Sequence, residues 1–182
     1  MLPLSESAGR IEGQEMFQIL AKANELEKSG MDILHFELGD PDFSTPENIV
    51  EAACKSLRGG DTHYTPSSGL HELKVMAQKV TEKSRGFTPG IDQLVVTSGA
   101  NVQIYYAIAC TVNPGDEVIV PDPGFVSYYS ILDFLGIKAI PVKLREEDGF
   151  TMRADDIKKA ITSKTKMIIV NSPSNPTGGV VG

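Results

Sequence analysis

The sequence predicts an α/β fold with a largely parallel sheet, and three observations support this prediction. After Pro89-Gly90, short apolar segments alternate with longer segments of helical character. The short segments are continuous apolar runs without polar alternation, which is typical of strands covered on both faces. Before that point, apolar residues recur at helical spacing. Strands joined by helices imply βαβ units, in which neighbouring strands run parallel.

The first half of the chain predicts helices separated by turn signals. An amphipathic helix is expected over Gln14–Lys28. A second helix is expected to start with Thr45 as N-cap and Pro46 at the first helical position, and to end at a Gly-Gly pair. A third helix is closed by Gly86. Between the first two helices lies a strand-like run, Ile33–Leu38, whose histidine is expected to be packed or hydrogen-bonded in the core.

The second half predicts strands and helices in alternation. The expected strands are Leu94–Val96, Glu117–Val120, Ile137–Val142 and Met167–Val170. The helices between them are expected over Ala100–Val112, Phe125–Leu135 and Ala154–Ile161. No helical segment follows the last strand, so a parallel sheet ending there would leave an apolar edge uncovered. The chain is therefore expected to be truncated at its C-terminus.

Composition narrows the class of protein. The chain has 182 residues, with 17 Lys and Arg against 24 Asp and Glu, for a formal net charge of −7. An acidic balance argues against a nucleic-acid partner, and no apolar run approaches the roughly 20 residues of a membrane helix. The N-terminus lacks the features of a signal peptide. Cys54 and Cys110 are isolated, so they predict reduced, buried thiols in a cytoplasmic protein and no metal site.

Ligands of open parallel sheets bind beyond the carboxyl ends of the strands. Three stretches that follow expected strands are therefore candidates for a ligand site. Thr97–Asn101 consists of small residues that lead into a helix, whose free amides would suit an anion. Phe125 follows the second strand and is able to stack on a flat ring. Asn171–Gly178 carries two Asn and two Pro, which would fix side-chain amides in place.

Each stretch also has a plainer structural interpretation. Ser98 is a suitable helix cap, Phe125 is a suitable core residue of the following helix, and Asn171–Gly178 is a suitable rigid turn. Taken alone, the first two stretches favour the plainer interpretation. Together, an anion site, a stacking ring and fixed amides at one edge suit a phosphorylated aromatic cofactor. Neither a P-loop nor a dinucleotide-binding glycine fingerprint occurs, which counts against the alternative of a nucleotide-binding module.

The motifs taken in order resemble the class I/II aminotransferases, pyridoxal-phosphate enzymes of the aspartate aminotransferase fold (fold type I). The motifs that carry the resemblance are Gly39–Phe43, Tyr64–Gly69, Thr97–Asn101, Asn113–Val118 and Asn171–Gly178. The resemblance implies an incomplete large domain, three-layered α/β/α with a mainly parallel sheet. Residues 1–45 would form the N-terminal arm and part of the small domain, and residues 46–182 the first half of the large, cofactor-binding domain.

The resemblance also implies roles for individual residues. The cofactor phosphate would be held by Ser98, Gly99, Ala100 and Asn101. Phe125 would stack on the pyridine ring, and Asn175 would bond to its phenolic oxygen and lie beside the substrate. Tyr64 would reach the phosphate bound by the other subunit of a homodimer. Substrate contacts would come from Gly39 and from Phe17, with Met16 beside it.

The family's catalytic residues have no counterpart in this sequence, above all the Schiff-base lysine. Lys164 lies among small residues that superficially resemble that lysine's surroundings, but it is expected at the opposite edge of the sheet as a solvated side chain. The implied function of the complete enzyme is transfer of an amino group between an amino acid and a 2-oxo acid through pyridoxal phosphate. The alternatives are an inactive truncated fragment and another fold-type I enzyme such as a C–S lyase.

Overall fold

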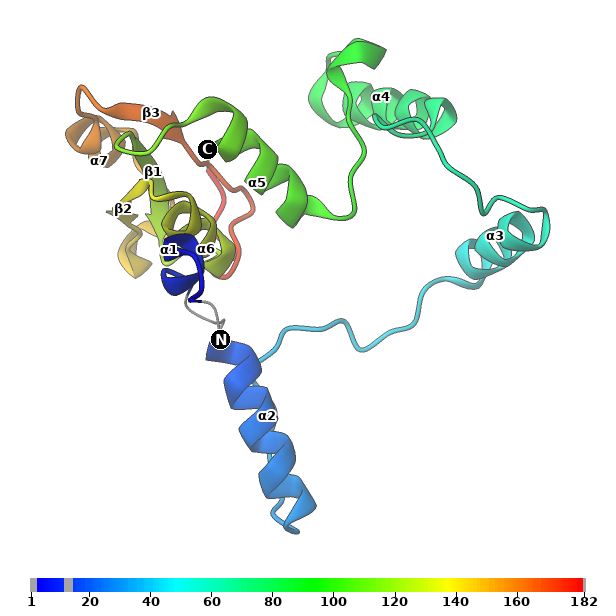
Figure 1. The fold of residues 1–182 in the computed structure, drawn as a ribbon, viewed down its shortest axis with the longest axis horizontal. Coiled ribbons are helices and arrows are strands. Elements are labelled where there is room, and N and C mark those ends of the chain that lie inside the picture. Colours follow the sequence, from blue (N-terminus) through cyan, green and yellow to red (C-terminus); the bar gives the residue numbers. More distant parts are fainter. Residues whose placement is uncertain (1–2, 12–14, 182) are drawn as a thin grey trace. The chain divides into compact units, whose positions relative to one another are not determined.

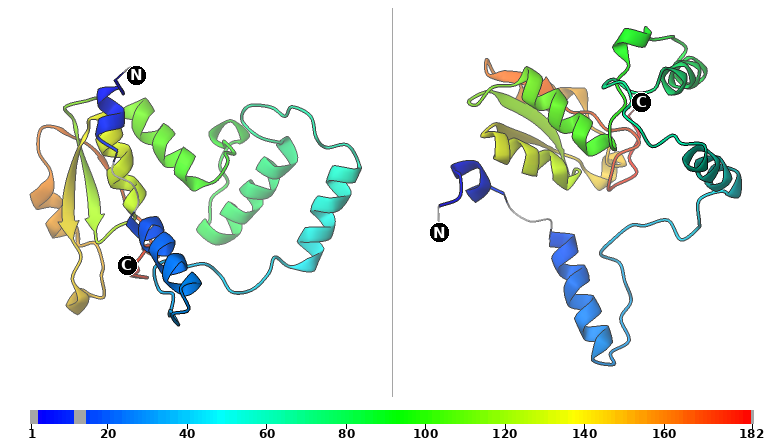
Figure 2. Two further views of the ribbon diagram at one scale, coloured as in Figure 1. Left: turned by 60° about the horizontal axis from the view of Figure 1, so that its bottom comes forward. Right: turned by 45° about the vertical axis from the view of Figure 1, so that its right-hand side comes forward.

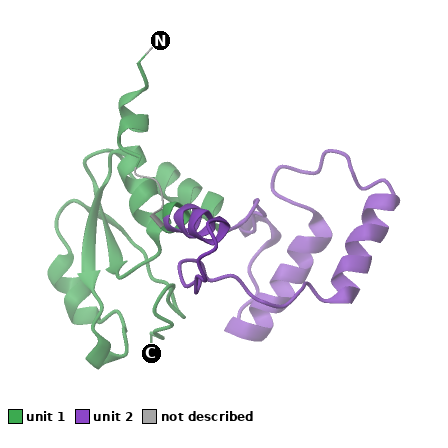
Figure 3. Cartoon of the chain, turned by 90° about the horizontal axis from the view of Figure 1, so that it is seen from below, with its two compact units in different colours: residues 1–18, 100–182 green, residues 19–99 purple. Residues whose placement is uncertain are grey.

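A computed structural model describes residues 3–11 and 15–181. The chain divides into two compact units, Met1–Gln18 with Ala100–Gly182, and Ile19–Gly99 (Figure 3). The division at residue 45 into two domains remains a prediction. Within the described residues, no helix combines the length and the apolar character that crossing a membrane requires.

The first unit is built on a parallel sheet. Its strands are β1 (Glu117–Asp122), β2 (Lys138–Lys143) and β3 (Thr165–Ile168), in the order β2-β1-β3 (Figure 1). Both pairings of β1 are parallel, with Ile119 opposite Ile140 on one side and Ile168 on the other. The predicted parallel sheet is therefore confirmed, with strand bounds shifted by one or two residues.

Helices cover both faces of this sheet. Alternate residues of a strand point to opposite faces, and β1 is buried on both. Val118 and Val120 pack with side chains of α5 (Ala100–Thr111) and α6 (Val126–Leu135). Ile119 faces a second cluster, against which Ile157 of α7 (Ala154–Ala160) packs. Figure 2 shows α7 across the sheet from α5 and α6, which gives the three-layer arrangement that the sequence predicts.

The N-terminal segment is attached to this unit through α1 (Glu6–Gly9), which packs on α6. Ser5 caps α1 by accepting the backbone N–H of Ala8 at 3.2 Å. Arg10 follows the helix and donates from Nε to the carbonyl of Asp133 at 2.8 Å and from Nη2 to that of Phe134 at 3.1 Å. These carbonyls lie in the last turn of α6, where that of Asp133 also accepts the N–H of Gly136 at 3.1 Å, so Arg10 adds a side-chain cap to the end of the helix.

The second unit consists of helices and extended segments. Helix α2 (Glu15–Lys28) contains the boundary between the units and is followed by α3 (Glu47–Arg58) and α4 (His71–Arg85). Short 3-10 turns occur at Ile91–Gln93 here and at Glu146–Asp148 in the first unit. Gly86 ends α4 in the left-handed conformation, as predicted.

The strands predicted in the second unit do not form. Within the described residues, neither Leu94–Val96 nor Ile33–Leu38 forms a strand, and the second run contains a bend at Glu37. A strand requires a ladder of backbone hydrogen bonds, whereas the backbone bond of Val96 is a single one from its N–H to the carbonyl of Ser68, at 3.0 Å. Apolar composition is insufficient to form a strand without a neighbouring strand. Val95 remains 55% exposed.

Two smaller predictions are also wrong. Pro46, not Thr45, is the N-cap of α3, and Glu47 is the first helical residue. The cysteines are free but not buried: Cys54 is half-buried and Cys110 is exposed. Cys110 lies on α5, and within this helix only Ile108 is buried.

Candidate cofactor site

The carboxyl ends of β1 and β3 lie at the same edge of the sheet, because the two strands are parallel. The segment after β1 leads to Phe125, and the segment after β3 contains Asn171 and Asn175. Helix α5 is joined to the start of β1 by a short turn, so its own first turn points back toward the carboxyl edge. The sheet topology thus places the first turn of α5, Phe125 and the loop after β3 at one edge.

Phe125 occupies the N-cap position of α6. The turn before it is tight, since a Cβ on Gly124 would overlap the carbonyl oxygen of Pro121. The Phe125 ring is half-buried and packs against the core cluster of α5, α6 and β1. It meets the ring of Tyr128 edge-on, with centroids 5.7 Å apart and an interplanar angle of 82°. Phe125 therefore has the core contacts of the plainer interpretation, and its stacking role stays a prediction.

Tyr128 is a residue of this edge that the sequence analysis did not single out. Its side chain is buried, with 5% of its surface exposed. Burial raises the pKa of its hydroxyl, and an interaction with the side chain of Asn171 acts in the opposite direction. Helical spacing does not point to it, because Phe125 is the N-cap of α6 with extended dihedral angles and Tyr128 lies within the helix.

The loop after β3 is held by its own backbone. Ser174 donates its N–H to the carbonyl of Gly179 at 2.8 Å, and Gly178 donates to the carbonyl of Ser174 at 2.7 Å. Ser172 Oγ accepts the N–H of Val181 at 3.0 Å. Asn175 lies between these contacts with an exposed side chain. These bonds fix the backbone of the loop, as its two prolines predict. The Asn175 amide is exposed to solvent.

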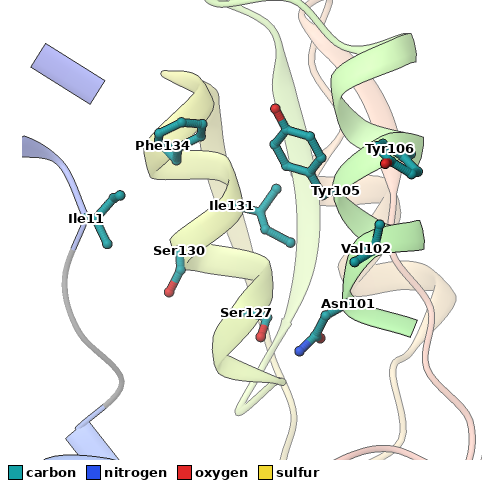
Figure 4. Close-up of a pocket in the computed structure, with 9 residues that line it drawn as sticks. All are labelled: Ile11, Asn101, Val102, Tyr105, Tyr106, Ser127, Ser130, Ile131 and Phe134. Atoms are coloured by element: carbon teal, nitrogen blue, oxygen red, sulfur yellow. The ribbon is translucent and has the colours of Figure 1, made fainter. Parts of the chain in front are cut away.

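The start of α5 offers backbone donors to an anion. The first amides of a helix have no intrahelical acceptors and lie at the positive end of its dipole. Asn101, in the first turn, lines a cavity of about 540 Å³ between α5 and α6. Figure 4 shows Asn101 and Ser127 at one end of this cavity, with Tyr105 and Phe134 toward the other. Neither Phe125 nor Asn175 lines it.

The remaining predicted residues of the site are exposed. Gly99 has φ +85°, and no atom lies within 4 Å of where its Cβ would be, so the backbone before α5 is open to a close approach. Ser98 and Gly39 are exposed. Tyr64 is fully exposed and lines a second cavity within its unit. Phe17 lies on α2 with half of its surface exposed.

Lys164 lies at the opposite edge of the sheet, as predicted. It directly precedes β3, and its carbonyl accepts the N–H of Glu117, the first residue of β1, at 2.9 Å. Its side chain is exposed. Lys164 therefore lies at the amino ends of β1 and β3, opposite the carboxyl edge.

The donor set at the carboxyl edge fits a phosphorylated aromatic group. A helix N-terminus next to an unobstructed glycine suits a phosphate, an aromatic side chain suits a flat ring, and an exposed amide suits a ring oxygen. These groups come from α5, the β1–α6 turn and the loop after β3. Within the described residues, no cluster of three or more metal-ligating side chains occurs.

The known proteins that this chain resembles include aminotransferases. The chain is 41% identical over 160 residues to the aspartate aminotransferase of Bacillus subtilis, covering 88% of this chain and 41% of that protein. It is 36% identical over 179 residues to a probable aspartate/prephenate aminotransferase of Aquifex aeolicus, covering 97% of this chain and 45% of the relative. The crystal structure of Thermus thermophilus aspartate aminotransferase with maleate matches with a TM-score of 0.94 at 35% identity, over 100% of this chain and 48% of that one.

The chain therefore spans a little under half the length of these relatives. The family model of aminotransferase class I and II matches residues 31–181, which include the motifs from Gly39 to Gly178 on which the resemblance was based. That range also contains the three predicted stretches at the carboxyl edge of the sheet. On this match, and on a fold shared with solved aspartate aminotransferases, the chain belongs to the class I and II aminotransferase family.

Proposed function

We propose that this chain is the N-terminal, cofactor-holding part of a pyridoxal-phosphate-dependent aminotransferase. The observation that carries the proposal is the family match over residues 31–181. The placement of α5, Phe125 and the loop after β3 at one sheet edge supports it. The complete protein would move an amino group between an amino acid and a 2-oxo acid.

The residues of this chain would bind and orient the cofactor. The first turn of α5, with Ser98 and Gly99 before it and Asn101 within it, would hold the phosphate by backbone and side-chain donors. Phe125 would cover one face of the ring, and Asn175 would donate its amide N–H to the phenolic oxygen. When bound, pyridoxal phosphate supplies the electron sink for negative charge that develops on the substrate.

The substrate and partner assignments follow from the resemblance. Gly39 and Phe17 would lie beside the substrate, and Tyr64 would reach the phosphate in the second subunit of a homodimer. The fully exposed side chain of Tyr64 is compatible with that reach. The curated relatives include aspartate, asparagine–oxo-acid and arginine–pyruvate transaminases, so their names do not define one substrate pair for this chain. A cytoplasmic location completes the proposal.

The chain alone is proposed to be inactive, because the lysine that forms the Schiff base has no counterpart in its sequence. With added pyridoxal phosphate, aspartate and 2-oxoglutarate, the purified chain should give no turnover above that of free cofactor. Turnover above that background would show that the chain is active by itself.

Cofactor binding is best tested with pyridoxine 5′-phosphate, which lacks the aldehyde and cannot react with surface lysines. Titration calorimetry on the full chain should give saturable binding with one site. Pyridoxine without the phosphate should bind more weakly, because the helix N-terminus would have no anion to hold. Asn175→Ala should weaken binding about threefold to tenfold through the loss of one hydrogen bond.

A matched control is Asn24→Ala, which replaces an exposed asparagine of α2 outside the proposed site. Its affinity should equal that of the parent chain. Equal binding of the two vitamers, or equal affinities of the Asn175 and Asn24 variants, would contradict the proposed site.

A further inference from the structure

Tyr128 stands out at the carboxyl edge because it is buried next to a residue that is not. Its side chain belongs to the core cluster, together with Leu132 of the same helix and Val120 of β1. Phe125 is only partly buried at the margin of that cluster. The two rings meet edge-on at 5.7 Å, a favoured geometry for aromatic pairs. One ring is thus fixed by the core, and the other is in contact with the fixed ring.

The position of Phe125 makes such a contact necessary. It precedes the first turn of α6 and has extended dihedral angles, so the helix does not restrict its side chain as it would an internal residue. The backbone below it is fixed by the Gly124 turn and by the bond from Tyr128 N–H to the Phe125 carbonyl, at 3.0 Å. What remains free is rotation of the Phe125 side chain, which an edge-on neighbour restricts.

We propose that Tyr128 is a positioning residue, whose core-anchored ring holds the Phe125 ring in the orientation that stacks on the cofactor. This inference rests on the proposed function, because the orientation of the Phe125 ring affects binding only if the cofactor binds at this edge. Asn171, in the loop after β3, lowers the pKa of the Tyr128 hydroxyl while burial raises it, so the hydroxyl is within reach of that loop. The ring supplies the contact with Phe125, and the hydroxyl is a secondary tie between two segments of the edge.

The test separates ring from hydroxyl with Tyr128→Phe and Tyr128→Leu in the full chain. Tyr129→Leu is the matched control, because Tyr129 is the next residue of α6 and its hydroxyl contacts the Pro121 carbonyl at 3.4 Å. The first readout is the set of Phe125 ring resonances in NMR spectra of chain labelled on phenylalanine. The second is the affinity for pyridoxine 5′-phosphate.

Tyr128→Phe should retain the Phe125 ring shifts, whereas Tyr128→Leu should move them toward the values of a freely rotating ring. Tyr128→Leu should also weaken binding about threefold to tenfold, the range expected for loss of one aromatic pair. Tyr129→Leu should change neither readout by a comparable amount. Because Tyr128 is buried, Tyr128→Met serves as a second variant if Tyr128→Leu does not fold.

Unchanged Phe125 shifts in the leucine or methionine variant would overturn the positioning role. So would affinities equal to that of Tyr129→Leu. If the parent chain binds no pyridoxine 5′-phosphate, the proposed function fails, and the ring resonances alone then decide whether Tyr128 positions Phe125.

Discussion

The two units of the chain differ in how their apolar residues are used. In the first unit, Val118, Ile119 and Val120 of β1 have no exposed surface. In the second unit, Leu34, Phe36 and Phe43 are 81%, 90% and 76% exposed. Among the described residues of the second unit, only Ala23 and Lys74 are buried. The first unit therefore has a core within this chain, whereas the second has helices whose apolar faces are largely uncovered.

This difference shows which elements form from the local sequence and which need packing partners. Helices α3 and α4 form where apolar spacing and terminal glycines predict them, although they bury almost nothing. The sheet forms only where three strands meet and helices cover them. Phe125, which is expected to stack on the cofactor ring, lies on the unit with a core and packs against that core. Gly39 and Tyr64 lie on segments without that support.

The largest expected effect comes from matched leucine truncations. Leu132 of α6 has no exposed surface, whereas Leu57 of α3 is 61% exposed. Leu132→Ala should lower the free energy of unfolding by about 2–5 kcal/mol through lost burial and a cavity. Leu57→Ala should change it by less than about 0.5 kcal/mol. Chemical denaturation followed by circular dichroism measures both, and similar losses would erase the distinction between the units.

A smaller effect is expected at the attachment of the N-terminal segment. Arg10→Gln removes a charged donor from the last carbonyls of α6 and should lower the free energy of unfolding by about 1 kcal/mol. Lys22→Gln, an exposed cation of α2, is the matched control and should have little effect. Thermal unfolding of the two variants compares them. Coincident transitions would mean that the Arg10 contacts to Asp133 and Phe134 contribute nothing.

The smallest effect concerns a histidine of the second unit. His35 Nδ1 lies 2.6 Å from Glu37 Oε1, and Nε2 lies 3.1 Å from Glu27 Oε1. The pKa of His35 is raised, first by Glu37 and then by Glu27, and the pKa of Glu37 is lowered by His35. The expectation of a hydrogen-bonded histidine is confirmed, but His35 is not in a core, because its side chain is 36% exposed.

The sign of the pH dependence follows from these shifts. Protonated His35 stabilises the fold below its unfolded pKa of 6.5, and this contribution is lost as pH rises through the raised pKa. Ionised Glu37 stabilises above 4.5, and its contribution is lost as pH falls through the lowered pKa. The pair should therefore be strongest between about pH 4.5 and 6.5.

An NMR titration of the His35 ring measures this coupling. Glu37→Gln should lower the titration midpoint more than Glu27→Gln, because Glu37 is the larger cause of the shift. Glu25→Gln, on helix α2 with Glu27, should leave the His35 titration midpoint unchanged. A common midpoint in all three variants would show that His35 is not paired in solution.

Much of the first unit was predictable because its signals are redundant. The turn at Asn113–Asp116, the apolar run of β1 and the helix ending at Gly136 each specify one element, and packing agrees with them. Leu94–Val96 has the same apolar composition, but composition does not provide a pairing partner. The motifs predict the residues of the proposed site, including Phe125 and Asn175. They did not identify Tyr128, because a supporting contact depends on which helix face meets the core.

Under the proposed function, the carboxyl edge of the β1–β3 sheet holds a phosphorylated pyridine ring. Mapping backbone and side-chain amide NMR shifts during titration with pyridoxine 5′-phosphate tests it most directly. The largest changes are expected at Asn101, Phe125 and Asn175. Changes confined to Tyr106 and Phe134 in the cavity between α5 and α6, with none at Phe125 and Asn175, would contradict it.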